Sequence, residues 1–169
     1  MVNQTLYIMT GLPYSGKSTL TKKLVNRFGF SVVSMDDIMD EKGMDSATMV
    51  QEDWNTVYSE AYDKLKALLK EGKSVVLDCG NLPIHERTTP KYIAESLGVQ
   101  CKLIYVNTTK EEIMRRWKEN QVTKQRGHLE EDGLNFAFKL FEQPKKDENP
   151  ILYNQSMDLD SWISTNIKD

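Results

Sequence analysis

The sequence is poor in several features that define particular classes of protein. Its two cysteines, Cys79 and Cys101, lie in strand-like segments and lack the spacing of a metal site, which indicates buried, reduced thiols. No apolar run approaches the ~20 residues of a membrane-spanning helix, and there is no internal repeat or low-complexity tract. The first strand-like run begins at Thr5, which leaves no room for a signal peptide, so we expect a cytoplasmic protein without a membrane partner.

An excess of basic residues is also missing. The chain has a net charge of −3, which argues against a broad nucleic-acid interface but leaves a local basic groove open. Its length of 169 residues and its ordinary composition fit one domain, residues 1–169, with a sizeable core.

The most informative stretch is Gly11-Leu12-Pro13-Tyr14-Ser15-Gly16-Lys17-Ser18, which reads G-x-x-x-x-G-K-S, the motif of a phosphate-binding P-loop. Gly11 and Gly16 allow the backbone to turn its N–H groups towards phosphate oxygens. Lys17 supplies a cation for the β- and γ-phosphates, and Ser18 a hydroxyl for Mg²⁺. We therefore expect ATP and Mg²⁺ as cofactors, and nucleotide-binding residues at Gly11, Tyr14, Ser15, Gly16, Lys17, Ser18 and Thr19.

The motif lies in the strand–loop–helix context that it requires. Five strand-like runs alternate with helical patterns along the chain, at residues 5–10, 31–34, 74–78, 102–106 and 151–153. This alternation predicts an α/β fold, with a parallel sheet covered by helices on both faces. Helix starts are expected at Ser46, at Thr89 with Pro90, at Thr109 with Glu112, and at Asp158 or Asp160.

Carboxylates follow two of the predicted strands. Asp36 and Asp37 come after residues 31–34, and Asp78 ends residues 74–78. Ligands bind at the carboxyl ends of the strands in open α/β sheets, so we expect at least one of Asp36 and Asp37 to face the acceptor and Asp78 to hold Mg²⁺. The structural alternative for each is that it caps the following helix.

Other candidates lie further along the chain. Arg87 is expected on the acceptor side, because its fork of donors suits a phosphate or a carboxylate. Trp54, Tyr58 and Tyr62 fit either an acceptor pocket or core packing, and packing is favoured. A basic helical hairpin at about residues 115–135 suits a mobile lid over the phosphates, with one or two of its basic residues reaching the nucleotide.

Several of these stretches together resemble the small P-loop kinases, in particular the polynucleotide kinase, zeta toxin and chloramphenicol phosphotransferase group. The stretches are Gly11 to Leu20, Ser34 to Asp37, Val75 to Leu82 with Arg87, and Glu112 to Arg116. The resemblance implies a three-layer P-loop fold with sheet order 2-3-1-4-5 and a helical lid. It also implies catalytic roles for Lys17, Asp36 and Arg116, with Asp36 accepting the proton of the acceptor hydroxyl.

Two positions depart from the group's pattern. Met39 stands where the phage polynucleotide kinase has an arginine, and Asn120 stands where the group has a second lid arginine. Arg126 is the alternative nucleotide-binding arginine, if an insertion in this chain has moved the second lid arginine from position 120 to position 126.

The function expected from the sequence is transfer of the ATP γ-phosphoryl group to a hydroxyl acceptor. A small-molecule acceptor is favoured, and a polynucleotide 5′-hydroxyl is the alternative. The net negative charge of the chain and the absence of an arginine at position 39 both disfavour the binding of a polyanion. A nucleotide-gated switch or binding module is the alternative of another class. No Asn-Lys-x-Asp stretch that reads guanine is present, which argues against a GTPase.

Overall fold

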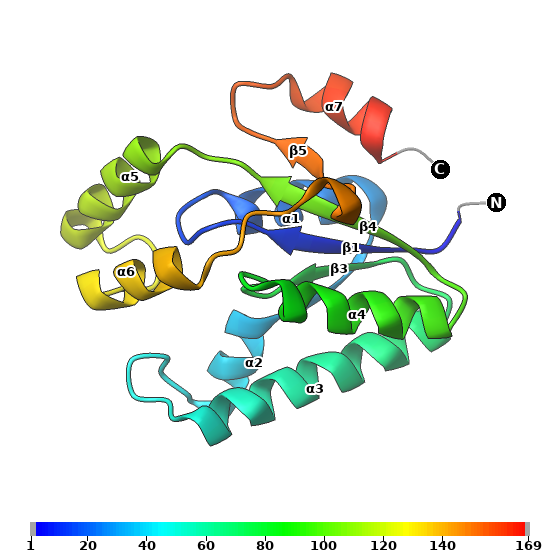
Figure 1. The fold of residues 1–169 in the computed structure, drawn as a ribbon, viewed down its shortest axis with the longest axis horizontal. Coiled ribbons are helices and arrows are strands. Elements are labelled where there is room, and N and C mark those ends of the chain that lie inside the picture. Colours follow the sequence, from blue (N-terminus) through cyan, green and yellow to red (C-terminus); the bar gives the residue numbers. More distant parts are fainter. Residues whose placement is uncertain (1–2, 168–169) are drawn as a thin grey trace.

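The computed structural model describes residues 3–167 and contains a five-stranded parallel sheet of order β2-β3-β1-β4-β5 (Figure 1). This is the predicted strand order. The strands are β1 (Thr5–Thr10), β2 (Ser31–Ser34), β3 (Val75–Asp78), β4 (Gln100–Val106) and β5 (Ile151–Tyr153). The helices are α1 (Lys17–Phe28), α2 (Met35–Lys42), α3 (Gln51–Lys70), α4 (Ile84–Ser96), α5 (Lys110–Thr123), α6 (Glu131–Leu140) and α7 (Leu159–Asn166), with a 3₁₀ turn η1 (Lys146–Glu148).

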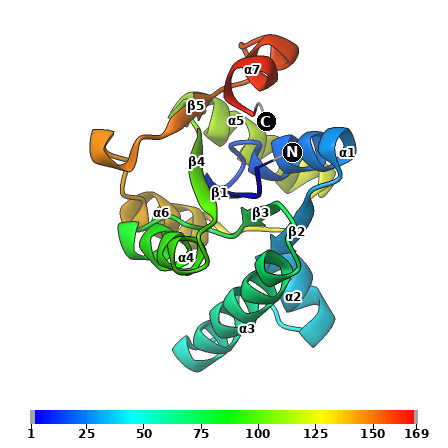
Figure 2. The same cartoon turned by 90° about the vertical axis from the view of Figure 1, so that its right-hand side faces the viewer.

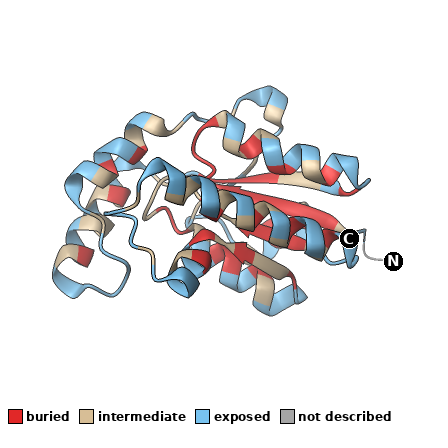
Figure 3. Ribbon diagram, turned by 90° about the horizontal axis from the view of Figure 1, so that it is seen from below, coloured by how far each residue is buried: buried red, intermediate tan, exposed pale blue. Residues whose placement is uncertain are grey.

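The sheet is buried on both faces because successive side chains of a strand point to opposite sides. In β1, Leu6 and Ile8 pack into a cluster with residues of α2, α3 and α4, whereas Tyr7 and Met9 pack into a second cluster with residues of α1 and α7. The two helical layers lie on either side of the sheet in Figure 2, and Figure 3 shows the buried strands between exposed helical surfaces. The predicted three-layer architecture is therefore confirmed.

Parallel pairing brings the candidate site residues to one edge of the sheet. Ser34 at the end of β2 lies opposite Asp78 at the end of β3, and Thr10 at the end of β1 lies opposite Tyr105 near the end of β4. Helices α5 and α6, over which the sequence predicted a lid, lie beyond this same edge, on the left of Figure 1.

Two predicted helix starts are wrong. α3 begins at Gln51, where the Asp53 carboxylate accepts a hydrogen bond from the Val50 amide, and Ser46 instead lies in a turn around Asp45.

α4 begins at Ile84, so Pro90 lies inside the helix and not at its first position. The proline removes one backbone hydrogen bond, while the hydroxyls of Thr88 and Thr89 donate to the carbonyls of Ile84 and His85 one turn earlier.

The other predicted starts are confirmed. Thr109 caps α5 by accepting a hydrogen bond from the Glu112 amide, and of the two open candidates it is Asp158 that caps α7. Within residues 3–167, no helix is long and apolar enough to cross a membrane.

Candidate functional site

The loop between β1 and α1 has a backbone that only glycine fits at two positions. Gly11 has φ 150°, and a Cβ atom there would lie 2.8 Å from the Val106 carbonyl oxygen. Gly16 has φ 101°, and a Cβ atom there would lie 2.4 Å from Nε2 of Gln155. At Gly11 the atom that a Cβ would meet belongs to the backbone, so a larger residue there forces the loop to move. At Gly16 the clashing atom is the flexible end of a side chain, which can shift, and it is the positive φ that favours glycine. The two fixed glycines of the motif are thus explained by this chain's own backbone.

Lys17 lies in the first turn of α1 and folds back across the loop. Its ammonium group donates hydrogen bonds to the carbonyls of Gly11 at 2.5 Å and Leu12 at 3.1 Å. Burial lowers the pKa of Lys17, while the nearby carboxylates of Asp78 and Asp36 act in the opposite direction. No side chain caps α1 at Gly16, so the first-turn N–H groups and the lysine together form a place suited to an anion.

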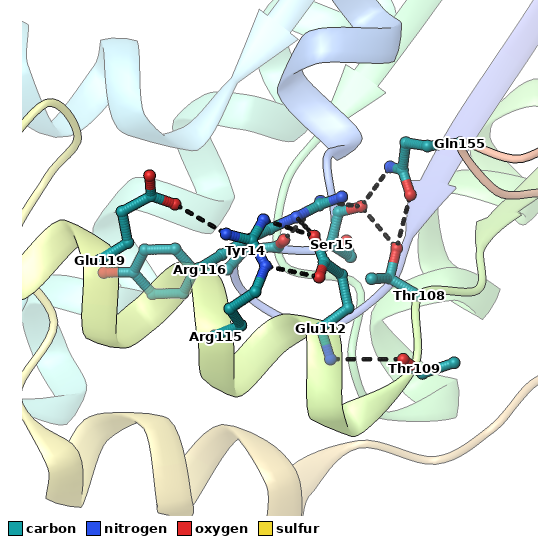
Figure 4. Close-up of polar contacts among 9 residues, drawn as sticks. All are labelled: Tyr14, Ser15, Thr108, Thr109, Glu112, Arg115, Arg116, Glu119 and Gln155. Atoms are coloured by element: carbon teal, nitrogen blue, oxygen red, sulfur yellow. Dashed lines mark hydrogen bonds and ion pairs between the residues drawn. The ribbon is translucent and has the colours of Figure 1, made fainter.

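The carbonyl oxygen of Ser15 is held from outside the loop by three side chains (Figure 4). It accepts hydrogen bonds from the hydroxyl of Thr108 at 2.7 Å, from Nε2 of Gln155 at 2.7 Å and from Nη1 of Arg116 at 3.3 Å. Arg116 also donates to the Tyr14 carbonyl at 3.1 Å and is oriented by the Glu112 carboxylate at 2.7 Å. The predicted lid arginine therefore reaches the P-loop, where it binds backbone carbonyls.

A second set of contacts joins the P-loop to the connection between α5 and α6. Tyr14, with φ 63°, donates from its hydroxyl to the Gly127 carbonyl at 3.4 Å and accepts from Nδ2 of Asn120 at 3.3 Å. Asn120 is buried and also accepts a hydrogen bond from the Arg126 amide at 2.9 Å. Asn120, which stands where the resembled family has a second lid arginine, therefore holds the connection between α5 and α6 against Tyr14.

The family assignment follows from the sequence over this same region. Residues 6–144, most of the chain, match the family model described as AAA domain. The chain belongs to the AAA domain family. A comparison with curated proteins found no match.

Solved structures resemble this AAA domain chain across nearly its whole length. A sugar kinase from Janibacter sp. HTCC2649 has 16% identity and a TM-score of 0.66, with 98% of this chain and 92% of that chain covered. A gluconokinase from Sinorhizobium meliloti 1021 has 13% identity and a TM-score of 0.67, with 96% and 89% covered. Kti12 from Chaetomium thermophilum, in complex with ADP-AlF3, has 17% identity and a TM-score of 0.72, with 94% of each chain covered. At these identities the likeness concerns the fold, and it confirms the predicted small P-loop kinase fold.

The acidic side of the AAA domain site lies on α2 and β3. Asp36 and Asp37 are exposed in the first turn of α2, whose cap is the Ser34 hydroxyl, accepting a hydrogen bond from the Asp37 amide. The pKa of Asp36 is raised, first because neighbouring atoms remove part of its water and second because Asp78 is close, and Lys17 only partly offsets this. The alternative that Asp36 or Asp37 caps this helix is wrong, because Ser34 is the cap, and the ligand-facing role of the two carboxylates stays a prediction.

Arg87 has different surroundings from those that the sequence predicted. Only 3% of its side chain is exposed, and its Nε and Nη2 donate to the Glu148 carboxylate at 2.7 and 3.0 Å. Its Nη1 donates to the carbonyls of Asn81 at 3.2 Å and Leu82 at 2.7 Å. The fork does bind a carboxylate, but this carboxylate belongs to the chain itself. Arg87 is therefore corrected from an acceptor-side candidate to a structural group that ties the β3–α4 turn to η1.

Two of the three aromatic residues singled out on α3 pack as the favoured interpretation predicted, and Tyr62 contacts the ring of Tyr58. Trp54 and Tyr58 pack against the core cluster on the α3 face of the sheet. Burial, followed by the nearby Glu86 carboxylate, raises the pKa of Tyr58, and burial raises the pKa of Tyr62 to about 12. Both hydroxyls therefore remain protonated at neutral pH.

Sequence reasoning missed three residues that shape this AAA domain site. Thr108 and Gln155 hold the Ser15 carbonyl, and Asn81 links the β3–α4 turn to the root of the P-loop. Asn81 is fully buried with φ 50°, donates from Nδ2 to the Met9 carbonyl at 2.7 Å, and accepts the Thr10 hydroxyl at 2.8 Å on its own carbonyl. The only signal in the sequence that could have identified Asn81 is its position shortly after a strand that ends in Asp78.

Proposed function

We propose that this chain is an ATP-dependent phosphotransferase that moves the γ-phosphoryl group to a hydroxyl acceptor. The observation that carries the proposal is the position of Asp36, which lies near enough to Lys17 and Asp78 for their charges to act on its carboxyl group. A nucleotide gripped by the P-loop thus has an exposed carboxylate beside its phosphate end. The kinases among the structural neighbours support the same reaction class.

The proposed chemistry is mainly positioning and charge neutralisation. The P-loop amides and Lys17 bind the phosphates, and Asp36 orients the acceptor hydroxyl and accepts its proton. A raised pKa makes Asp36 a stronger base than an ordinary aspartate, which suits the acceptance of a proton.

The residues present suit Mg²⁺. Ser18 offers an exposed hydroxyl at the start of α1, and Asp78 a half-buried carboxylate at the end of β3. Oxygen ligands are those that Mg²⁺ prefers, and the repulsion between Asp36 and Asp78 marks a place where a cation relieves negative charge. Ser18 and Asp78 would hold the ion, which supplies charge neutralisation on the phosphates.

The acceptor proposed is a small molecule with a hydroxyl group. Asp37 and Asp40 lie on α2 beside Asp36, so this side of the site is acidic and repels a polynucleotide. Arg87, the cation that the sequence placed there, is fully engaged with Glu148 and two backbone carbonyls. The sugar kinase and the gluconokinase among the neighbours support this class of acceptor.

The test compares Asp36→Asn with a matched control, Asp63→Asn, which changes an exposed aspartate on the outer surface of α3. Acceptors from a panel of polyols, sugars, nucleosides and 5′-hydroxyl oligonucleotides are supplied with ATP and Mg²⁺, and ADP release is measured. We expect Asp36→Asn to lower acceptor-dependent turnover by roughly 10²–10⁴-fold with ADP affinity unchanged, and Asp63→Asn to have no effect. Unchanged turnover in Asp36→Asn, or an equal loss of ADP affinity, would refute the assigned role.

A nucleotide-gated switch is the second candidate function. The contacts of Arg116, Asn120 and Tyr14 connect the P-loop directly to α5 and to the predicted lid. Nucleotide binding at the P-loop would therefore change the position of this lid. ATP consumption that requires no acceptor and responds to a protein partner would favour the switch over the transferase.

A further inference from the structure

The carbonyl oxygen of Ser15 has more hydrogen-bond donors around it than it has lone pairs. A carbonyl oxygen has two lone pairs, yet this one has three donors, which come from α5, from the β4–α5 connection and from the β5–α7 connection (Figure 4). Segments that are far apart in the sequence therefore converge on a single peptide group of the P-loop.

The orientation of this peptide group determines where the next amide points. The described chain contains no cis peptide bond, and in a planar trans peptide the C=O and N–H bonds point to opposite sides. Because the Ser15 carbonyl is drawn outwards by its three donors, the Gly16 N–H is turned inwards. The interior of the loop is the space that the motif provides for phosphate.

Gln155 has the geometry of a specific donor. Its Nε2 lies 2.7 Å from the Ser15 carbonyl, and its Oε1 lies 3.2 Å from the Thr108 hydroxyl. The reverse amide orientation would set two oxygen atoms against each other, so only this one satisfies the contact. Thr108 has a single proton, which it can donate either to the Ser15 carbonyl at 2.7 Å or to Oε1 of Gln155 at 3.2 Å.

Gln155 also lies directly over Gly16, because a Cβ atom on that glycine would meet the glutamine Nε2 at 2.4 Å. It lies outside residues 6–144, the part of the chain that the family model matches. The contact is therefore an observation on this chain and not a property taken from the family.

We propose that Gln155 is a positioning residue that, with Thr108, holds the Ser15–Gly16 peptide so that the Gly16 N–H faces the polyphosphate of the bound nucleotide. Gln155 then acts on nucleotide affinity through the phosphates and not through the base. This inference rests on the proposed nucleotide site at the P-loop.

The experiment uses the full chain and three variants, Gln155→Ala, Gln155→Glu and Thr108→Val, with Ser156→Ala as the control in the same connection. The Ser156 hydroxyl contacts Asn154 and not the P-loop. Calorimetry measures the affinities for ADP, for inorganic pyrophosphate and for adenosine, and thermal melting checks that each variant is folded.

Loss of one hydrogen bond predicts about a fivefold weaker affinity of Gln155→Ala for ADP and for pyrophosphate, with adenosine unchanged. Gln155→Glu has nearly the same shape but cannot donate, so its carboxylate faces the carbonyl and the loss is larger than for alanine. Thr108→Val weakens the same two ligands and spares adenosine, and Ser156→Ala binds all three ligands normally.

Two outcomes overturn the inference while leaving the nucleotide site intact. One is wild-type affinity for ADP in Gln155→Glu, since a residue needed only for its shape tolerates this change. The other is an equal loss for adenosine and ADP in Gln155→Ala, which would assign the glutamine to the base. If the wild-type protein binds neither ADP nor pyrophosphate, the proposed function itself fails.

Discussion

Removal of Glu148 tests whether Arg87 supports the fold or the acceptor. The Glu148 side chain is 14% exposed and that of Arg87 is 3% exposed, so Glu148→Ala leaves a guanidinium almost without water and with Nε and Nη2 unpaired. Breaking a buried ion pair on one side costs about 3–5 kcal/mol. For a chain of this length about 2–4 °C of melting temperature is lost per kcal/mol, which gives a decrease of roughly 10 °C.

The matched control is Glu95→Ala, which removes the partner of Lys91 in an exposed pair at 3.8 Å on the same helix α4. This change is expected to cost less than about 0.5 kcal/mol. The double variant Arg87→Met/Glu148→Leu removes both charges and should recover part of the loss, although the carbonyls of Asn81 and Leu82 lose their donor.

The pair also makes stability depend on pH. Partial burial alone would raise the pKa of Glu148, but the hydrogen bonds from Arg87 and from the Lys145 amide outweigh it, and the pKa is lowered. The contribution is therefore present above the unfolded pKa of about 4.3 and is lost as the pH falls through the folded pKa.

The assay is urea unfolding of the wild type and of Glu148→Ala, Glu95→Ala, Arg87→Met and the double variant, at pH 7 and at a pH well below the unfolded pKa of about 4.3, combined with the acceptor KM of each. The reasoning is refuted if Glu148→Ala is as stable as Glu95→Ala. It is also refuted if Arg87→Met changes the acceptor KM with no loss of stability, because Arg87 would then serve the acceptor as the sequence suggested.

Three further predictions concern the site itself. The raised pKa of Asp36 places the acid limb of the kcat profile at a higher pH than an ordinary aspartate gives, and Asp40→Asn should move this limb to lower pH, because one of the charges that raises the pKa is removed. Lys17→Met should weaken ADP binding by about 10–100-fold, as expected for a charge-assisted hydrogen bond, and equal ADP affinity in calorimetry would contradict the P-loop assignment. Asn120→Leu removes the donor and acceptor that hold Tyr14 and Arg126, so hydrogen exchange should speed up in residues 124–130 and stay unchanged in β1, whereas uniform exchange would argue against a local clamp.

Local signals, periodic signals and the family resemblance account for what was predicted correctly from the sequence. The P-loop is contiguous, and its glycines meet steric limits that the motif already encodes. The strand order follows from the family resemblance, and the alternation of buried residues in β1 reflects the period of a strand.

The errors arise where the deciding partner lies far along the chain. Arg87 was assigned to the acceptor because nothing near it identifies Glu148, 61 positions later, as its carboxylate. Gln155 lies 140 positions from Ser15, and no pattern links the two.

The error at α4 has a local cause. Proline is common at the first position of a helix, so Pro90 was taken as the start of α4, whereas it lies in the interior of that helix.

The buried asparagine in the β3–α4 turn has a mechanical consequence. Asn81 bonds the β3–α4 turn to Met9 and Thr10, the last two residues before the P-loop, and its carbonyl also accepts Arg87. The β3–α4 turn and the base of the P-loop are therefore held together by hydrogen bonds. For the proposed phosphotransfer, we expect the movement that admits substrates to occur in α5 and α6 and not in this turn.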